Sequence, residues 1–151
     1  MADVFISYAR GDKARVAPLV AAIEAKGWTV WWDPEIDAGQ QFDDQIEAEL
    51  LAAAAVVVVW TATSVSSRWV RGEAREAADR NILVPVRFDA ARLPMDVRAI
   101  HTIDLDAWNA DVGSASFQDL ARALEAMIAR QRKAIGGAQS GFGTTTSAPS
   151  K

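Results

Sequence analysis

The chain of 151 residues predicts an α/β fold, because strand-like and helix-like segments alternate along it. Short runs of β-branched and aromatic residues recur, and segments with apolar residues at helical spacing separate them. The valine run at residues 56–59 and the helical pattern at residues 67–80 form one such pair. Alternation of this kind indicates a parallel sheet with helices on both faces. Five strands in this order predict the flavodoxin-like arrangement, with strand order 2-1-3-4-5.

The first strand and helix come from the N-terminal segment. The apolar run at residues 4–8 predicts a strand, and the polar residues 9–12 form the turn after it. Gly27 marks the end of the following helix. Pro18 is unfavourable inside a helix, so either the helix starts near Arg15 or its early part is kinked. The core face of this helix is expected to hold Val16, Leu19, Val20 and Ile23.

A polar segment separates the second strand from the second helix. Residues 28–32 are dense in aromatic side chains and predict the strand, with Trp28 in the core. Residues 33–42 have the composition of a loop. Asp43 or Asp44 is expected to cap the second helix, which leads to the third strand at residues 55–60. Its buried residues are expected to be Ile46, Leu50 and Ala53.

The remaining elements follow the same alternation. Residues 82–88 predict the fourth strand, at an edge or a bulge because Pro85 lacks a backbone donor, and residues 101–105 predict the fifth. The last helix is expected to start at Ser116, with Asp119 in capping-box position. Small residues make the core face of the third helix, namely Val70, Ala74, Ala77 and Ala78. The last helix is expected to bury Phe117, Leu120, Leu124, Met127 and Ile128.

Bulk properties place the chain among globular proteins. We expect one domain at residues 1–135 and a flexible tail or linker at 136–151, which leads to a further domain such as a sensor. The net charge of -4, without a basic cluster, argues against nucleic-acid binding. The sequence has no Cys and one His, so we do not expect a protein-bound metal. It shows neither a leader nor an apolar run of about 18 residues, so we expect a cytoplasmic domain without membrane contact.

Several chemistries common on such sheets do not fit the residues. The turn after the first strand carries no phosphate-binding glycine pattern, and the third strand ends in Trp60 and Thr61 instead of a phosphoacceptor Asp. A catalytic Ser has no G-x-S-x-G context. The only His, His101, begins a late strand and is expected to be structural. A carboxylate remains as the group that could carry chemistry.

Glu73 is the carboxylate with the most unusual surroundings. It lies one helical turn after Trp69, and none of its helical neighbours is a cation, whereas Glu76 has Arg80 four residues on. Desolvation by Trp69 and the charge of Glu76 would both raise the pKa of Glu73. The alternative is a surface carboxylate near a helix N-terminus, where negative charge is favourable. Spacing alone leaves both interpretations open.

Three ordered motifs resemble the Toll/interleukin-1 receptor (TIR) domain. The first is D-V-F-I-S-Y-A-R at residues 3–10, and the second is W-T-V-W-W-D-P-E-I-D-A-G-Q-Q-F at residues 28–42. The third, at residues 57–77, is similar to the region as bacterial members carry it, and V-P-V-R-F at 84–88 fits the next strand. The resemblance spans about residues 3–132 and leaves only the tail uncovered.

The resemblance implies a site and an activity. Many members of the family cleave NAD⁺ at the nicotinamide bond with a Glu in an S-x-W-x-x-x-E arrangement, which Ser67, Trp69 and Glu73 reproduce. It therefore implies that Glu73 is catalytic and that NAD⁺ is the substrate, without a cofactor or a metal. The residues implied to bind substrate are Tyr8, Ala9, Arg10, Trp32, Asp33, Ser67 and Trp69. The loop implied to contact a neighbouring subunit includes Pro34, Glu35, Ile36, Asp37, Gly39 and Phe42.

Two functions from different classes stay open at this point. One is an NAD⁺ glycohydrolase that releases nicotinamide and ADP-ribose, or a cyclic ADP-ribose, as the effector of bacterial immune or antiphage signalling. In that case self-assembly through TIR–TIR contacts would activate it. The other is a non-catalytic interaction module, either a signalling adaptor or a virulence factor, that recruits partners through residues 33–42.

Overall fold

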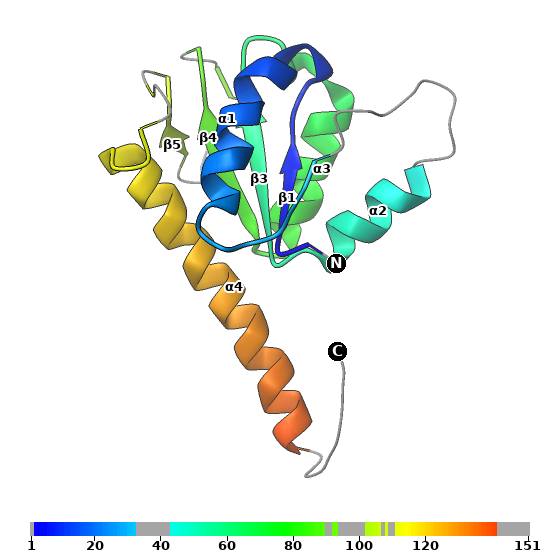
Figure 1. Ribbon diagram of the computed structural model, residues 1–151. Coiled ribbons are helices and arrows are strands. Elements are labelled where there is room, and N and C mark those ends of the chain that lie inside the picture. Colours follow the sequence, from blue (N-terminus) through cyan, green and yellow to red (C-terminus); the bar gives the residue numbers. More distant parts are fainter. Residues whose placement is uncertain are drawn as a thin grey trace.

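The structure is a computed structural model, and it describes residues 2–32, 43–89, 92–93, 102–106, 108 and 111–141. Strands and helices alternate along the chain (Figure 1). The strands are β1 (Val4–Ser7), β2 (Val30–Trp31), β3 (Ala55–Trp60), β4 (Leu83–Arg87) and β5 (Ile103–Asp104). The α-helices are α1 (Lys13–Glu24), α2 (Asp43–Ala52), α3 (Arg68–Asp79) and α4 (Ala115–Gly141), with short 3-10 helices η1 (Arg10–Asp12) and η2 (Ser64–Ser66).

The sheet has the predicted topology. Its five strands lie in the order β2-β1-β3-β4-β5, and every pair is parallel. The flavodoxin-like prediction is therefore confirmed. Because all strands run the same way, the segments that follow β1 and β3 leave the sheet at the same edge. Ser7 and Trp60, the last residues of β1 and β3, lie at that edge.

Strand side chains alternate between two cores, one on each face of the sheet. Val4 and Ile6 of β1 point to the face that α1 and α4 cover, whereas Phe5 packs on the opposite face with residues of α2 and α3. The first core is the larger and includes Leu19, Ile23, Phe117, Leu120, Leu124 and Ile128 from its helices. The second includes Ile46, Leu50, Val70, Ala74 and Ala77 from its helices.

Pro85 does not lie on an edge strand, contrary to the sequence-based prediction. It pairs with Val58 in the interior strand β4. The Phe88 amide, just after β4, bonds to Trp60 of β3, and the Arg87 carbonyl accepts from Leu105 on the β5 side. Because backbone groups alternate in direction along a strand, the nitrogen of Pro85 also lies on the β5 side. β5 begins opposite Val86, one residue after Pro85. The donor that Pro85 lacks would therefore lie before the first paired residues of β4 and β5. The proline therefore removes no hydrogen bond from the described sheet.

Helix α1 starts at Lys13, earlier than the start near Arg15 that Pro18 suggested. Pro18 is therefore inside the helix, where it leaves the carbonyl four residues before it without an intrahelical donor. The predicted core face is confirmed, because Val16, Leu19, Val20 and Ile23 are all buried. Gly27 has φ 94°, the left-handed conformation that favours glycine, and it follows the end of the helix as predicted.

The N-terminus of α4 differs from its sequence-based prediction, and the C-terminus of α3 makes contacts that the sequence did not indicate. Helix α4 is capped by Ser114, whose hydroxyl accepts a hydrogen bond from the Phe117 amide at 3.2 Å, so the cap of Ser116 with Asp119 is wrong. Arg80 donates to the carbonyl oxygens of Leu50 at 2.9 Å and Leu51 at 2.8 Å instead of forming a simple pair with Glu76. Arg80 therefore ties the end of α3 to the last turn of α2, where a cation is favourable.

Helix α4 continues to Gly141, past the boundary that the sequence indicated at residue 135. Figure 1 shows its C-terminal part extending beyond the sheet. Within the described ranges, no helix combines the length and the apolar character that a bilayer crossing requires. His101, Asp33 and the rest of the predicted interaction loop (Pro34, Glu35, Ile36, Asp37, Gly39 and Phe42) lie outside the described residues.

Candidate functional site

Glu73 lies on the buried side of α3, against the carboxyl end of β1. Its side chain is only 7% exposed, although α3 presents exposed residues on both sides of it in the sequence. The Ser7 hydroxyl, at the end of β1, donates a hydrogen bond of 2.5 Å to Oε1 of Glu73. The other oxygen, Oε2, is buried and has no hydrogen-bond partner among the described residues. The surface-residue interpretation of Glu73 is therefore wrong.

Burial changes the acidity of this carboxyl group. It raises the pKa of Glu73 to about 7, while the Ser7 hydroxyl and the Trp69 side chain favour the ionised form and offset part of that rise. The direction agrees with the sequence-based prediction, but desolvation is the main cause and the expected effect of the exposed Glu76 is not found. A carboxyl group with a pKa near neutrality can exchange a proton at physiological pH.

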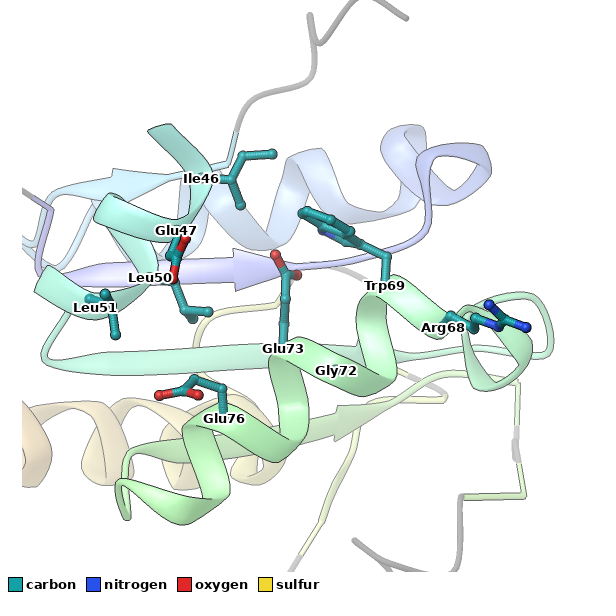
Figure 2. A pocket seen from close by; sticks show the side chains of 9 residues that line it. All are labelled: Ile46, Glu47, Leu50, Leu51, Arg68, Trp69, Gly72, Glu73 and Glu76. Carbon is teal, nitrogen blue, oxygen red and sulfur yellow. The ribbon is translucent and has the colours of Figure 1, made fainter. Parts of the chain in front are cut away.

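A cavity of about 490 Å³ opens between α2 and α3, within the size range of small-molecule sites. Figure 2 shows Glu73 pointing from α3 into this region, with the indole of Trp69 on one side and Leu50 and Ile46 of α2 on the other. Trp69 is 49% exposed and forms part of the rim. The remaining lining residues are Glu47, Leu51, Arg68, Gly72 and Glu76. Apolar side chains and two further carboxylates, Glu47 and Glu76, therefore surround the buried acid, and Arg68 points away from it (Figure 2).

Hydroxyl groups fix the start of α3 and hence the position of Trp69. Ser67 caps the helix, because its Oγ accepts from the Val70 amide at 3.2 Å. Before it, the Thr61 hydroxyl donates to the buried carboxylate of Asp12 at 2.6 Å, and the Ser64 hydroxyl donates to the Val59 carbonyl at 2.7 Å. The Thr61–Asp12 bond joins the turn after β3 to the turn after β1, whereas the Ser64 bond ties the turn to the end of β3 itself. The Ser/Thr-rich segment therefore holds the helix that carries Glu73 at a defined place.

The structure brings together only some of the residues that the resemblance implied. Trp69 lines the cavity with Glu73, and Ser67 acts as the helix cap. The Tyr8 and Trp32 rings contact each other at 5.8 Å and pack against the core on the α1/α4 face. These two rings do not line the described cavity, and their role toward a substrate stays a prediction.

Four further aromatic or loop residues can be placed. Ala9 is buried and Arg10 is exposed in η1, close in sequence to Ser7, and neither lines the cavity. Trp28 is partly buried against the α1/α4 core, in agreement with its predicted core role. Trp31 stacks on Phe5 with ring centroids 5.2 Å apart.

Sequence reasoning missed Ser7 and the α2 side of the cavity. Ser7 is 2% exposed and is the polar residue of an otherwise apolar strand, on the same side as Phe5. A buried hydroxyl in such a strand needs a partner, and that requirement was the available signal. Ile46 and Leu50 were predicted only as core residues, although they also line the cavity. Among the described residues, no three His, Cys, Asp or Glu side chains gather as metal ligands would.

Comparison with known families decides the relationship of the chain. The family model described as "TIR domain" matches residues 4–127, which is most of the chain. The chain belongs to the TIR domain family. No curated protein matches this TIR domain in sequence.

Solved structures of TIR domains share its fold. The TIR domain of the Toll-related receptor TRR-2 from Hydra magnipapillata matches with a TM-score of 0.69 and 19% identity, over 83% of this chain and 99% of that one. A TIR-STING receptor from C. gigas, in complex with 2',3'-cGAMP, matches with a TM-score of 0.66 and 23% identity, over 82% of this chain and 39% of that one.

A third structure contains TIR domains in an assembly. The TIR domains of the activated Roq1 resistosome, which directly recognises the pathogen effector XopQ, match with a TM-score of 0.52 and 22% identity. The match covers 85% of this chain and 82% of that one. At these identities the structural matches support the fold of this TIR domain.

Proposed function

We propose that this TIR domain is an NAD⁺ glycohydrolase in which Glu73 is the catalytic residue. The observation that carries the proposal is the state of its carboxyl group. It is 7% exposed, beside a cavity, and one of its oxygens has no partner in the described structure. Buried carboxyl groups with a raised pKa are typical of catalytic sites. Glu73 also stands at the position that the motif resemblance assigned to the catalytic Glu.

A single carboxylate is sufficient for this chemistry. The bond between the ribosyl C1′ and the nicotinamide nitrogen breaks, and its electron pair goes to that nitrogen, so that nicotinamide leaves as a neutral molecule. The ribosyl centre becomes oxocarbenium-like, and the Glu73 carboxylate stabilises its positive charge in a site of low dielectric. A water molecule then adds its oxygen to C1′ and gives up a proton to the carboxylate, which yields ADP-ribose. If a group of the substrate attacks C1′ instead of water, the product is a cyclic ADP-ribose.

The exposed apolar rim of the cavity supports activation by assembly. Trp69 and Leu51 are each 49% exposed beside the cavity, and a second TIR domain that packed there would exclude water from Glu73. We propose a homo-oligomer as the active form and a bacterial immune or antiphage role in the cytoplasm. A sensor domain after the C-terminal segment would then control assembly.

The alternative is a TIR domain that only binds protein partners. The same exposed Trp69 and Leu51 favour it, because exposed apolar side chains are common in interaction surfaces. A pure adaptor gives no reason for a buried carboxyl group with an unpaired oxygen, since that group lowers stability. The two functions therefore differ in what they require of Glu73.

The deciding experiment measures nicotinamide release from NAD⁺ over a range of protein concentrations. We expect release whose rate per molecule increases with protein concentration, because two subunits build the active form. Glu73→Ala should lower the rate at least about 100-fold, as expected when the main electrostatic stabiliser is lost. Glu24→Ala is the matched control, since Glu24 is an exposed acid on α1 and should have no effect.

The outcomes separate the two functions. Absence of release at every concentration, or equal release by the parent protein and Glu73→Ala, would contradict the enzyme proposal. A self-associating protein without release would support the interaction module. A rate per molecule that is independent of concentration would contradict activation by assembly while leaving the catalytic role intact.

A further inference from the structure

We propose that Ser7 is a positioning residue, whose hydroxyl holds Oε1 of Glu73 and so reserves Oε2 for the substrate. The inference rests on the proposed function of Glu73 and adds a residue to it. Ser7 belongs to β1 and Glu73 to α3, so the bond joins two elements that lie 66 residues apart in the sequence. No sequence pattern within one element would reveal this pair.

The contact is buried and short. Ser7 is 2% exposed, Glu73 is 7% exposed, and the distance from Oγ to Oε1 is 2.5 Å. A short O–H to carboxylate bond is the geometry of a charge-assisted hydrogen bond. Because Ser7 lies in a strand that pairs with both β2 and β3, its backbone position is fixed by the sheet. The hydroxyl is therefore a rigid donor, in contrast to a donor on a loop.

The two carboxylate oxygens are consequently unequal. Oε1 accepts from the Ser7 hydroxyl, whereas Oε2 is buried and makes no hydrogen bond, although the Trp69 side chain lies close enough to the carboxyl group to favour its ionised form. A buried acceptor without a partner is uncommon and lowers stability unless a ligand supplies the missing donor. The hydroxyl groups of a ribose are donors of this kind. Ser7 therefore prevents rotation of the carboxyl group and directs its unpaired oxygen to the sugar.

Ser7 also controls the charge of the group it positions. The hydroxyl bond favours the carboxylate over the protonated acid, against the desolvation that raises the pKa of Glu73. The other groups that face Glu73 are Trp69 from α3 and the apolar Ile46 and Leu50 from α2. Glu47 and Glu76 line the same cavity and are exposed, and Arg68 points away. Among these neighbours, Ser7 is the one that belongs to the sheet, and its hydrogen bond favours the ionised form of Glu73.

The test compares Ser7→Ala with Ser64→Ala. Ser64 is the matched control, because its hydroxyl is also buried at the same edge of the sheet but bonds only to backbone groups, the Thr61 amide and the Val59 carbonyl. The carboxyl carbon of Glu73 is labelled with ¹³C and its titration is followed by NMR, with Glu73→Gln used for assignment. We expect the midpoint in Ser7→Ala to rise by about one pH unit, since hydrogen bonds to charged groups have roughly that effect. Ser64→Ala should leave it unchanged.

Kinetic measurements on the assembled full chain provide the second readout. For Ser7→Ala we expect kcat at pH 7 to fall about tenfold, with KM nearly unchanged and a smaller loss at higher pH, where Glu73 is ionised. Should Ser7→Ala fail to fold, Ser7→Cys keeps a similar volume with a weaker donor and should shift the midpoint in the same direction by less.

Each result decides one question. A Glu73 midpoint that is the same in Ser7→Ala and the parent protein overturns the role of Ser7, and so does a loss of kcat that is equal at all pH values. Absence of NAD⁺ cleavage by the parent protein overturns the proposed function, but the NMR titration still tests whether Ser7 holds Glu73. The two failures are therefore distinguishable.

Discussion

The two faces of the sheet are filled in different ways. On the α1/α4 face, the buried cluster formed by the described residues is apolar and takes side chains from both strands and helices. On the α2/α3 face the cluster is smaller, and it borders Ser7, Glu73 and a cavity of about 490 Å³. The α1/α4 face therefore contributes mainly stability, whereas the α2/α3 face holds a desolvated reactive group beside a cavity, at some cost in stability.

The largest expected effect tests the stabilising role of the α1/α4 face. Leu124 on α4 is fully buried, so Leu124→Ala should lower the free energy of unfolding by about 2–5 kcal/mol. Leu51→Ala on α2 removes the same atoms from a side chain that is 49% exposed and should cost less than about 1 kcal/mol. Urea denaturation measures both. Equal losses would show that the two faces do not differ in this way.

The next effect concerns the pH dependence of stability on the α2/α3 face. The pKa of Glu73 is raised from 4.5 to about 7, so the folded state retains the proton that the unfolded state releases between these values. The contribution is fully present below pH 4.5 and is lost as pH rises to about 7. We therefore expect the free energy of unfolding to fall by about 3 kcal/mol over this window.

Glu73→Gln should remove this decrease, whereas Glu24→Gln, an exposed control, should keep it. The lowered pKa values of Asp89 and Asp104 affect stability only at lower pH, since their contribution is lost as pH falls below the ordinary range of Asp. Urea titrations at several pH values between 4.5 and 8 provide the measurement. A parent protein whose stability is flat in this window would argue against a neutral, buried Glu73.

A smaller effect compares the two serine caps, one on each face. Ser67→Ala and Ser114→Ala each remove a hydroxyl that accepts a backbone amide, and each should cost about 1 kcal/mol of unfolding free energy. Their effects on NAD⁺ cleavage should differ if Ser67 also contacts substrate. A higher KM for Ser67→Ala alone would support the substrate role that the motif implies. Equal KM values would leave Ser67 as a cap.

The smallest expected change in stability is that of Trp69→Ala. Its side chain is 49% exposed, so its loss should change the free energy of unfolding by less than about 1 kcal/mol, although the residue is large. Cleavage of NAD⁺ should fall, because the indole lies beside the carboxyl group of Glu73 and forms one wall of its surroundings (Figure 2). Thermal unfolding and nicotinamide release measure the two effects. A large loss of stability would indicate that Trp69 packs in the core and not at the rim of the cavity.

Local patterns were sufficient to predict the sheet and most of the buried helix faces. The valine run of β3 and the small residues of α3 carry their periodicity within one element, so the sequence indicates them directly. Spacing to Trp69 made Glu73 a candidate, and the motif resemblance implied its catalytic role. Its burial depended on how α3 packs on β1, which local spacing left open.

Features that depend on contacts between distant segments were missed. Arg80 binds carbonyl groups about 30 residues earlier, and Ser7 binds a side chain 66 residues later. Two serines, Ser114 and Ser116, lie at the start of α4, and either could form its N-cap. Ser114 is used in a turn where Trp108 stacks on Phe117 at 5.7 Å, a contact that the sequence around the serines does not show. Tertiary packing decided each of these cases.

The unpaired oxygen of Glu73 affects which substitutions are expected at this position during evolution. A neutral residue of similar shape at position 73, such as Gln, would be expected to give a more stable domain near pH 7, because it carries no buried charge. A lineage released from selection for catalysis would therefore be expected to lose the acid early. Descendants that keep it would mark those in which the enzyme is still used.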